Sequence, residues 1–460
     1  MIRNLNGLPT RIISLLLVLI LLLGSLSSCF RKQSTPSKED IQESISESKK
    51  SRDYAYQYLL DWGMPSFDYI KFLVFEQKIK TEYNFSALPD TREHAKQAAE
   101  DFLENYYSKI NLSNKTEVTD ALLTCFVAAL GDPYSLYRPP LATENYNTDM
   151  QGEFGGIGVM IEYNSKEGTL TISSPIPGSP AERAGIMSGD VITAVDGAKV
   201  SDVGYEDALN LIRGKIGTTV KITVLRGDTT LDFTLVRELV KETSVAYTID
   251  DETNIGYVQI ASFKNNTFAQ FKEAIDALEA AGVAGIIFDL RNNTGGYVHS
   301  VCDMVSYLIP SGKTIVSYQY KGEDVTYVKS GDDGGEDHVV DLPMAVLCNA
   351  MTASSAEIFT SAIRDYRNSG LLSAVIVGTT TYKKGIMQAS YGYSDGSSIT
   401  LTIAFYYPPC GVNYHGVGIT PDVYIELPTP EKDEDGNYLP VEDTQLDGAF
   451  SELQKLINAN

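Results

Sequence analysis

The feature that most constrains the fold is an alternation of strand-like and helix-like runs between Val240 and Leu427. Short apolar runs such as Ala284–Leu290 and Met344–Cys348 alternate with stretches whose apolar residues recur at helical spacing. Strands separated by helices favour a layered α/β arrangement with parallel strand pairs. The strand Met344–Cys348 is expected to lead into a helix from about Ser354 to Tyr366.

A mostly helical block precedes this layer, from Tyr54 to Leu130. Asp132-Pro133 ends the block, because the proline ring and its missing N–H cannot continue a helix. The aromatic residues Trp62, Phe72 and Phe75 are expected to lie in the core of this block. Nothing in its sequence indicates chemistry.

The amino-terminal segment is expected to be a targeting signal. Arg3 and Arg11 precede the apolar run Ile12–Leu23, which is shorter than the ~20 residues of a membrane-spanning helix. The following Leu26-Ser27-Ser28-Cys29 resembles a bacterial lipobox, which implies cleavage before Cys29 and a lipid on that cysteine. A plain secretory signal or an uncleaved anchor is the alternative. The polar stretch up to Asp53 has too few apolar residues to fold alone and predicts a tether.

Charge and composition exclude several classes of function. The 460 residues are 43% hydrophobic and carry a net charge of −23, which argues against nucleic acid and against docking on anionic lipid. The cysteines after Cys29 are Cys125, Cys302, Cys348 and Cys410, and we expect no disulfide because the first three lie in apolar runs. With four histidines, no HExxH and no CxxC, neither a metal nor a cofactor is predicted.

Ser354 and Lys384 indicate a serine hydrolase that works without a histidine. A serine hydroxyl needs a neighbouring base, and a neutral lysine can provide one. Free lysine titrates near ~10.4, so the base needs an enclosed apolar site that lowers its pKa. Gln388 follows Lys384 by four residues, which would place both side chains on one face of a strand. The amide oxygen of Gln388 could then hold the amine.

The middle block, from Gly152 to Glu238, contains short β-rich runs and helical runs at Pro180–Ala184 and Tyr205–Arg213. This order resembles a PDZ domain. Its opening loop, Gly155-Gly156-Ile157-Gly158-Val159, resembles the PDZ carboxylate-binding loop, in which consecutive N–H groups turn toward one carboxylate. The resemblance implies that an extended peptide with a free C-terminus pairs with the neighbouring strand. A simple tight turn is the alternative for a glycine cluster alone.

Five segments in order resemble the C-terminal processing (tail-specific) proteases, a family that joins a PDZ domain to a Ser-Lys catalytic core. They span about Leu130 to Leu427. The segments are Gly131–Ser135, the PDZ-like block, Asn349–Phe359, Lys384–Gln388 and Gly418–Asp422, and Asp289–Gly296 upstream of the serine segment adds to the resemblance.

The resemblance implies a role for each matching residue. Ser354 matches the nucleophile, Lys384 the general base and Gln388 the last residue of the Lys-Gly-x-x-Gln pattern. A helix beginning at Ser354 would offer the N–H of Ser355 to an oxyanion. The family takes its second oxyanion donor from the loop that holds Gly295 and Gly296, and the choice between these two stays open.

The chain departs from the family pattern at three positions. Met351 and Lys383 replace glycines, and Thr294 replaces the proline before the paired glycines. The charge of Lys383 could stay in water or disturb its neighbour. In addition, Asn368–Ser373 looks like a short insertion, which loops tolerate at small entropic cost.

These features together predict a multidomain α+β protein: an exported, lipid-anchored serine endopeptidase that cuts polypeptides near their C-termini. We expect it in a bacterial cell envelope, on the periplasmic or extracellular face, with a homo-oligomer or an adaptor left open. The rival functions are an inactive PDZ-containing protein that holds C-terminal tails, and a histidine-dependent hydrolase. His415 is interpreted as structural or as lying at the rim of the site. The expected regions are a lipoprotein signal (1–28), a tether (29–53), a helical domain (54–150), a PDZ domain (151–239), a protease core (240–428) and an acidic extension (429–460). The extension ends in a helical run, Phe450–Ile457, that is expected to be peripheral.

Overall fold

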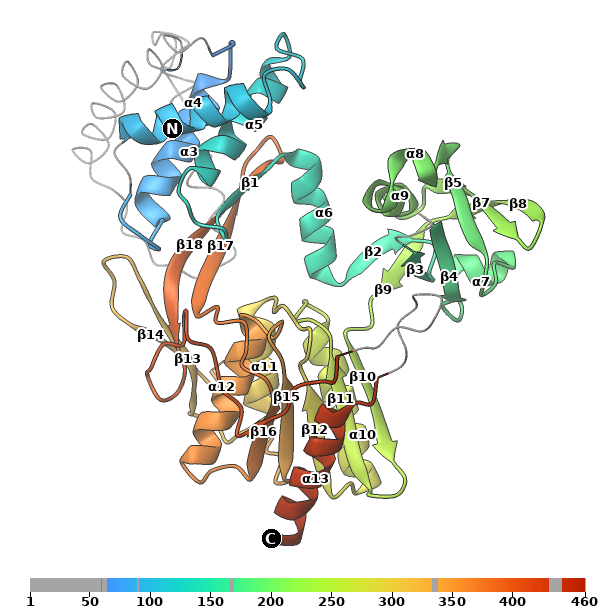
Figure 1. The fold of residues 1–460 in the computed structure, drawn as a ribbon, viewed down its shortest axis with the longest axis vertical. Helices are drawn as coiled ribbons and strands as arrows, with labels where there is room; N and C mark the ends of the chain where they lie inside the picture. The colour runs from blue at the N-terminus through green and yellow to red at the C-terminus, as the bar shows by residue number, and fades with distance from the viewer. Residues whose placement is uncertain are drawn as a thin grey trace, which may run out of the picture. The chain divides into compact units, whose positions relative to one another are not determined.

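The computed structural model describes residues 64–88, 91–164, 169–332, 338–429 and 441–459, together with Leu59. The expected signal, Cys29, the tether, Trp62 and part of the acidic extension lie outside the described residues. No helix of the described part is long and apolar enough to cross a membrane. The chain forms two compact units (Figure 1). One contains the residues up to Glu144 with Gln319–Asp324 and Ile386–Phe405; the other contains Asn145–Tyr318, Val325–Gly385 and the residues from Tyr406 onward.

The first unit combines helices with a small antiparallel sheet. Phe72 stacks on Phe126 with ring centroids 4.7 Å apart, and Phe75 packs edge-on against Tyr137. Both Phe72 and Phe75 are fully buried, which confirms their predicted core positions. The helices are α3 (Tyr69–Glu82), α4 (Thr91–Asn105) and α5 (Lys115–Ala128), and in the sheet β18 (Ser398–Tyr407) pairs with β1 (Leu136–Arg138) and β17 (Ile386–Gly392).

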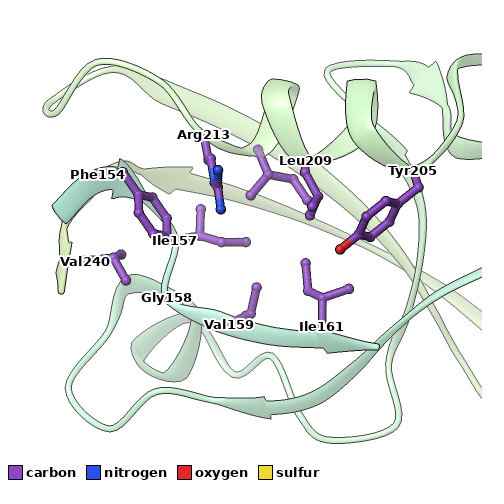
Figure 2. Close-up of a pocket in the computed structure, with 10 residues that line it drawn as sticks. Phe154, Ile157, Gly158, Val159, Ile161, Tyr205, Leu209, Arg213 and Val240 are labelled. Atoms are coloured by element: carbon purple, nitrogen blue, oxygen red, sulfur yellow. The ribbon is translucent and has the colours of Figure 1, made fainter. Parts of the chain in front are cut away.

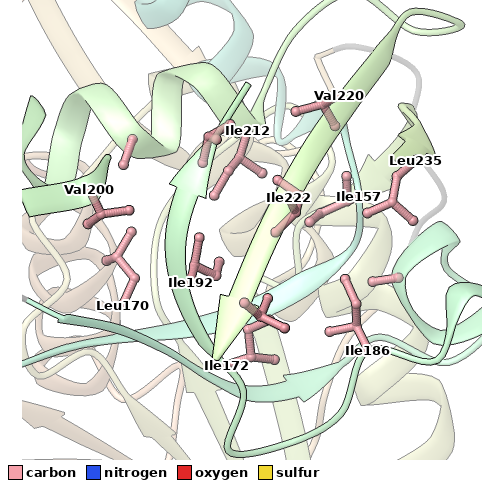
Figure 3. Close-up of a cluster of buried hydrophobic side chains, with 14 residues drawn as sticks. Ile157, Leu170, Ile172, Ile186, Ile192, Val200, Ile212, Val220, Ile222 and Leu235 are labelled. Carbon is pink, nitrogen blue, oxygen red and sulfur yellow. The ribbon is translucent and has the colours of Figure 1, made fainter. Parts of the chain in front are cut away.

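Helix α6 (Pro140–Gln151) leads into the PDZ domain of the second unit. The domain is an antiparallel sheet in the order β3-β4-β5-β7-β8, with a separate ladder between β2 and β9. Alternate apolar residues of its strands, such as Ile172, Ile192 and Ile222, pack inward against the helices (Figure 3). The elements are β2 (Glu153–Gly156), β3 (Val159–Asn164), β4 (Thr169–Pro175), α7 (Pro180–Ala184), β5 (Val191–Val195), β6 (Ala198–Lys199), α8 (Val200–Val203), α9 (Tyr205–Ile212), β7 (Thr219–Arg226), β8 (Thr229–Val236) and β9 (Glu238–Lys241).

The remainder of the second unit is the predicted α/β layer. Its sheet runs β10-β11-β12-β15-β16-β19, and every pair is parallel except β10 with β11. Strands β12, β15 and β16 are buried along their whole length, as expected for central parallel strands. The strands are β10 (Val245–Asp250), β11 (Ile255–Ile260), β12 (Gly285–Asp289), β15 (Met344–Cys348), β16 (Ala374–Gly378) and β19 (Val423–Tyr424). Outside this sheet, β13 (Thr314–Tyr320) pairs antiparallel with β14 (Thr326–Lys329).

Helices cover both faces of this sheet. Phe288 of β12 contacts Phe271 of α10 (Thr267–Ala281) and Phe359 of α12 (Ser355–Asn368), and α11 (Val298–Leu308) packs between these two helices. The neighbouring Ile287 points the other way, toward α13 (Thr444–Ala459). This alternation is the two-residue period of a strand.

Helix α13 was interpreted from the sequence as peripheral, and that interpretation is wrong. Ala449 and Leu453 are fully buried against the sheet, and Figure 1 shows α13 lying across it. Arg291, directly after β12, holds the start of the helix by donating to both carboxylate oxygens of Asp443. An apolar stripe on one face of α13, among otherwise polar neighbours, explains why it covers the sheet.

Candidate active site

The candidate site lies at the carboxyl edge of the parallel sheet, where the loops after β12 and β15 meet. The Thr352 hydroxyl donates to the Leu290 carbonyl at 2.8 Å, and the Ala353 N–H donates to the Asn293 carbonyl at 2.9 Å. The side-chain oxygen of Asn349 also accepts the N–H of Asn292. Adjacent parallel strands place their following loops side by side, and these bonds fix the two loops to each other.

Ser354 stands between β15 and α12 in a strained backbone conformation. Its φ is 56° and its ψ is −117°, which is left-handed and unfavourable for any residue other than glycine. Strain of this kind persists only where surrounding contacts enforce it, and it is concentrated at functional sites. The serine therefore occupies a sharp, strained strand-to-helix turn like that of a nucleophile elbow.

Glu357, three residues further along α12, connects Ser354 to the Lys384 loop. One oxygen of its carboxylate, Oε2, accepts both the Ser354 N–H at 3.0 Å and the Lys384 N–H at 2.8 Å. The other oxygen accepts the Thr381 hydroxyl at 2.6 Å and the Lys383 N–H at 2.9 Å. The residues predicted as nucleophile and base therefore have their backbones bound to the same atom.

The carboxyl group of Glu357 has no exposed surface. Burial raises its pKa, and the hydrogen bonds from Thr381, Lys384, Lys383 and Ser354 offset part of that rise. A buried carboxylate is tolerated only when hydrogen bonds replace its lost hydration. The carboxylate therefore needs the hydrogen bonds from these residues to remain buried, and the loops need the carboxylate to keep their positions. The sequence analysis missed Glu357; the signal that could have found it is a glutamate three residues after a helix-starting serine.

The loop that carries Lys384 is strained one residue earlier. Lys383 has a φ of 84°, so it occupies the left-handed region at the position where the family pattern has glycine. Its carbonyl accepts the Gly416 N–H at 3.0 Å, and the Thr352 carbonyl accepts the N–H of Tyr382 at 2.9 Å. Lys383, which replaces a glycine of the family pattern, thus has a backbone φ angle that favours glycine.

Gln388 and Lys384 do not lie on one continuous strand, as was expected from their spacing. Strand β17 begins at Ile386, after Lys384, and a register shift separates Met387 from Gln388. Strand alternation therefore cannot be used to pair the two side chains. The Gln388 amide nitrogen donates to the Thr402 hydroxyl at 3.1 Å, within the first unit.

The two candidate glycines of the oxyanion loop differ in whether their N–H group already donates a hydrogen bond. The Gly295 N–H already donates to the Asn293 side chain at 2.9 Å. Within the described part of the chain, no acceptor binds the N–H groups of Gly296 and Ser355. The Ser355 hydroxyl donates to the Gly296 carbonyl at 2.9 Å and so joins the loop to the start of α12. This geometry favours Gly296 over Gly295 as the second oxyanion donor.

At both positions a side chain would clash with neighbouring atoms, and the φ angle favours glycine. A Cβ on Gly295 would lie 2.8 Å from the Ser354 Cβ, and one on Gly296 would lie 2.1 Å from the Phe263 carbonyl oxygen. Their φ values of 105° and 145° also disfavour other residues. Asn293, which the sequence analysis did not single out, is fully buried and shapes this turn by bonding the Ile260 carbonyl and the Gly295 N–H.

The PDZ domain has an apolar groove beside its edge strand β3. In Figure 2, Ile157, Val159 and Ile161 face Leu209 and Tyr205 of α9 across this groove. Because β3 is at the edge of its sheet, it can pair with an added strand. The complete lining is Phe154, Ile157, Gly158, Val159, Ile161, Tyr205, Leu209, Ile212, Arg213 and Val240.

The predicted carboxylate loop is shorter than its sequence suggested. Gly155 and Gly156 belong to β2, where they pair with Leu239 and Glu238 of β9. The turn itself is Ile157–Gly158, and β3 starts at Val159. Arg213, whose guanidinium lies 4.5 Å from the centre of the Phe154 ring, places a positive charge at the same end of the groove (Figure 2).

Metal-ligand residues come together at one place in the described chain, where Asp276, Glu279 and His338 approach one another. Asp276 already accepts hydrogen bonds from the Lys272 ammonium and the Tyr307 hydroxyl. His338 bonds the Tyr307 carbonyl through Nδ1 and Glu279 through Nε2. These partners account for the cluster as a contact between α10, α11 and the segment that begins at His338. In the described part of the chain, Cys125, Cys302, Cys348 and Cys410 form no disulfide.

Residues 254–425 match peptidase family S41, and residues 155–236 match the PDZ domain. The probable CtpA-like serine protease of Staphylococcus haemolyticus is 36% identical over 324 residues, which cover 70% of this chain and 62% of that protein. The corresponding protein of Staphylococcus aureus strain MRSA252 is 34% identical over 331 residues, which cover 71% and 64%. The chain thus spans less than two thirds of the length of these relatives.

A solved structure, the photosystem II D1 C-terminal processing protease, is 25% identical, with a TM-score of 0.43, over 83% of this chain and 96% of that one. The two family matches occur in the order expected from the sequence, with the PDZ domain first. The chain thus contains a PDZ domain followed by a peptidase S41 region and is similar to CtpA-like serine proteases.

Proposed function

We propose that the chain is a serine endopeptidase that cleaves polypeptides near their C-termini, with Ser354 as nucleophile and Lys384 as general base. The observation that carries this proposal is the Glu357 oxygen that accepts the N–H groups of both residues. A shared acceptor fixes the position of the two loops relative to each other, although they are distant in the sequence. Catalysis by proximity requires such a fixed arrangement.

The chemistry follows from the positions of the donors. Neutral Lys384 removes the proton of the Ser354 hydroxyl as its oxygen attacks the peptide carbonyl. The N–H groups of Ser355 and Gly296 stabilise the oxyanion, helped by the positive end of α12. Lys384 then gives its proton to the departing amine, and water hydrolyses the acyl-enzyme by the same steps.

The PDZ groove is proposed to bind the C-terminus of the substrate. Its apolar lining fits apolar terminal side chains, edge strand β3 accepts the extended backbone, and Arg213 complements a carboxylate. Recruitment through the tail would then hold the polypeptide near the catalytic residues and raise its effective concentration.

The first prediction concerns the catalytic base. Ser354→Ala and Lys384→Arg should each lower kcat at least about a thousandfold, since guanidinium does not deprotonate in the working range. Wild-type kcat/KM should rise with pH as Lys384 loses its proton. The matched control is Lys383→Arg, which should keep most activity. A Lys384→Arg protein with near-normal turnover would refute the assignment, and loss of activity in His415→Ala would favour the histidine-dependent alternative.

The second prediction concerns Glu357. Glu357→Gln replaces one acceptor oxygen by an NH₂ group, so two of its donors lose their partner at about 1–3 kcal/mol each. We expect kcat to fall strongly and the free energy of unfolding to fall by about 2–6 kcal/mol. Asp365→Asn, at a buried carboxylate near the other end of α12, should destabilise the protein without a comparable loss of kcat. Equal kcat losses in the two variants would show that Glu357 acts only through stability.

The protonation of Glu357 should affect stability and turnover in opposite directions as the pH falls. Its folded-state pKa is raised, so protonation favours the folded state; this contribution to stability is present at low pH and is lost as pH rises through the folded-state pKa. A protonated carboxyl is a poorer acceptor for the loops. Acid loss of turnover through this group should therefore precede acid unfolding, as measured by activity and circular dichroism on the same samples.

The third prediction concerns the groove. In full-length Ser354→Ala protein, amidating the C-terminus of a peptide should weaken its binding by about tenfold or more, because a charge-assisted hydrogen bond is lost. Leu209→Lys should weaken binding of the free acid, whereas Asp207→Lys, on an exposed position of the same helix, should not. If calorimetry gives equal affinities for the peptide acid and the peptide amide, the groove does not recognise a free C-terminus.

The proposed location is a bacterial cell envelope, with the chain anchored by a lipid on Cys29. The support is the basic, apolar and small-residue order of positions 1–29. Cys29→Ser should abolish incorporation of a fatty-acid label and move the protein from the membrane to the soluble fraction. Unchanged labelling and fractionation in this variant would exclude the anchor.

A further inference from the structure

A buried lysine lies where the chain passes between the PDZ domain and the protease core. Lys264, in the segment between β11 and α10, has 9% of its side chain exposed. Its ammonium donates to Glu242 at 2.7 Å and to Asp149 at 3.0 Å. Asp149 is in α6, just before the PDZ domain, and Glu242 follows β9, just after it. A buried ammonium needs such partners, so Lys264 binds both connections at once.

Neighbouring residues hold the same two connections through the backbone. The Asn266 side chain donates to the carbonyls of Gly152 and Glu242, at 2.8 Å and 3.2 Å. The Glu242 N–H donates to the Gly152 carbonyl, and the Asn265 N–H to the Met150 carbonyl. The entering and leaving strands β2 and β9 therefore run side by side into one anchoring point (Figure 1).

On its other side, this segment is continuous with the oxyanion loop. Phe263, adjacent to Lys264, donates its N–H to the Gly295 carbonyl at 3.0 Å and accepts the Tyr297 N–H at 2.7 Å. The Phe263 carbonyl lies so close to Gly296 that even a Cβ there would clash. A shift of Phe263 must therefore move Gly295–Tyr297, since close-packed backbone transmits displacement.

The peptide groove meets the same two strands. Phe154 of β2 and Val240 of β9 both line it, and Val240 is two residues before Glu242. A ligand in the groove thus contacts the connections that Lys264 holds.

We propose that Lys264 is a positioning residue for the oxyanion loop: through Asp149 and Glu242 it links the strands that enter and leave the PDZ domain to the Phe263 backbone and so to Gly296. This inference rests on the proposed function of Gly296. Loss of the ammonium leaves Ser354, Lys384 and the groove intact, but frees the segment that supports one oxyanion donor. Small displacements of such a donor lower kcat strongly.

The test is turnover of a short internal-site peptide by the full chain, with and without a saturating peptide that carries a free apolar C-terminus. Lys264→Met should lower kcat about tenfold or more while KM changes by less than about twofold. Lys264→Arg should recover most of the rate. Tail peptide should change the kcat of the wild-type enzyme and leave that of Lys264→Met unchanged. Lys241→Met, at an exposed lysine of β9, is the matched control and should behave as wild type.

The outcomes are separable. A folded Lys264→Met protein with kcat within twofold of wild type overturns the inference, and so does an equal tail-peptide effect in both proteins. If Lys264→Met fails to fold, the double variant Asp149→Asn, Glu242→Gln makes the same measurement, because both carboxylates are partly exposed. Activity remaining in Ser354→Ala would instead overturn the proposed function itself.

Discussion

The candidate site depends on one buried carboxylate. Glu357 bonds Ser354, Thr381, Lys383 and Lys384, and these residues come from two loops with no sequence continuity. Hydrogen bonds to a charged group contribute about 1.5–3 kcal/mol each, and here they offset part of the cost of burying the carboxylate. Without this acceptor, the unfavourable φ angles of Ser354 and Lys383 would have little to hold them.

The parallel sheet provides the rigid base for this arrangement. Buried strands β12 and β15 bring their following loops together, and Asn293, Asn349 and Thr352 bond one loop to the other. The oxyanion loop is supported from behind by Phe263. The candidate nucleophile and the candidate oxyanion loop are thus held by backbone contacts at the ends of different strands, which limits their independent motion.

Patterns that are local in sequence predicted the fold well. The alternation between Val240 and Leu427 predicted the parallel layer, and the glycine-rich turn with its following strands predicted the PDZ domain, both of which the structure has. The position of Ser354 at a strand-to-helix junction was also predictable, since it needs only the order of two elements.

Features that depend on long-range contacts were not predictable. Glu357 and Asn293 resemble ordinary helix and turn residues until the partner loops are placed. The role of α13 depended on which apolar stripe the sheet leaves uncovered, and the Gln388 argument failed because a register shift interrupts β17. The role of Lys264 could not be inferred from the sequence, because its partner Asp149 lies 115 residues away, on the other side of the PDZ domain.

The most direct test of the account is to map the residue that a serine-directed phosphonylating probe modifies. The account predicts a single adduct on Ser354, formed faster as pH rises, absent in Ser354→Ala and much slower in Lys384→Ala. Peptide mapping by mass spectrometry distinguishes Ser354 from its neighbours Ser355 and Thr352. An adduct on either neighbour, or an unchanged rate of labelling in Lys384→Ala, would contradict the assignment of Ser354 and Lys384 as nucleophile and base.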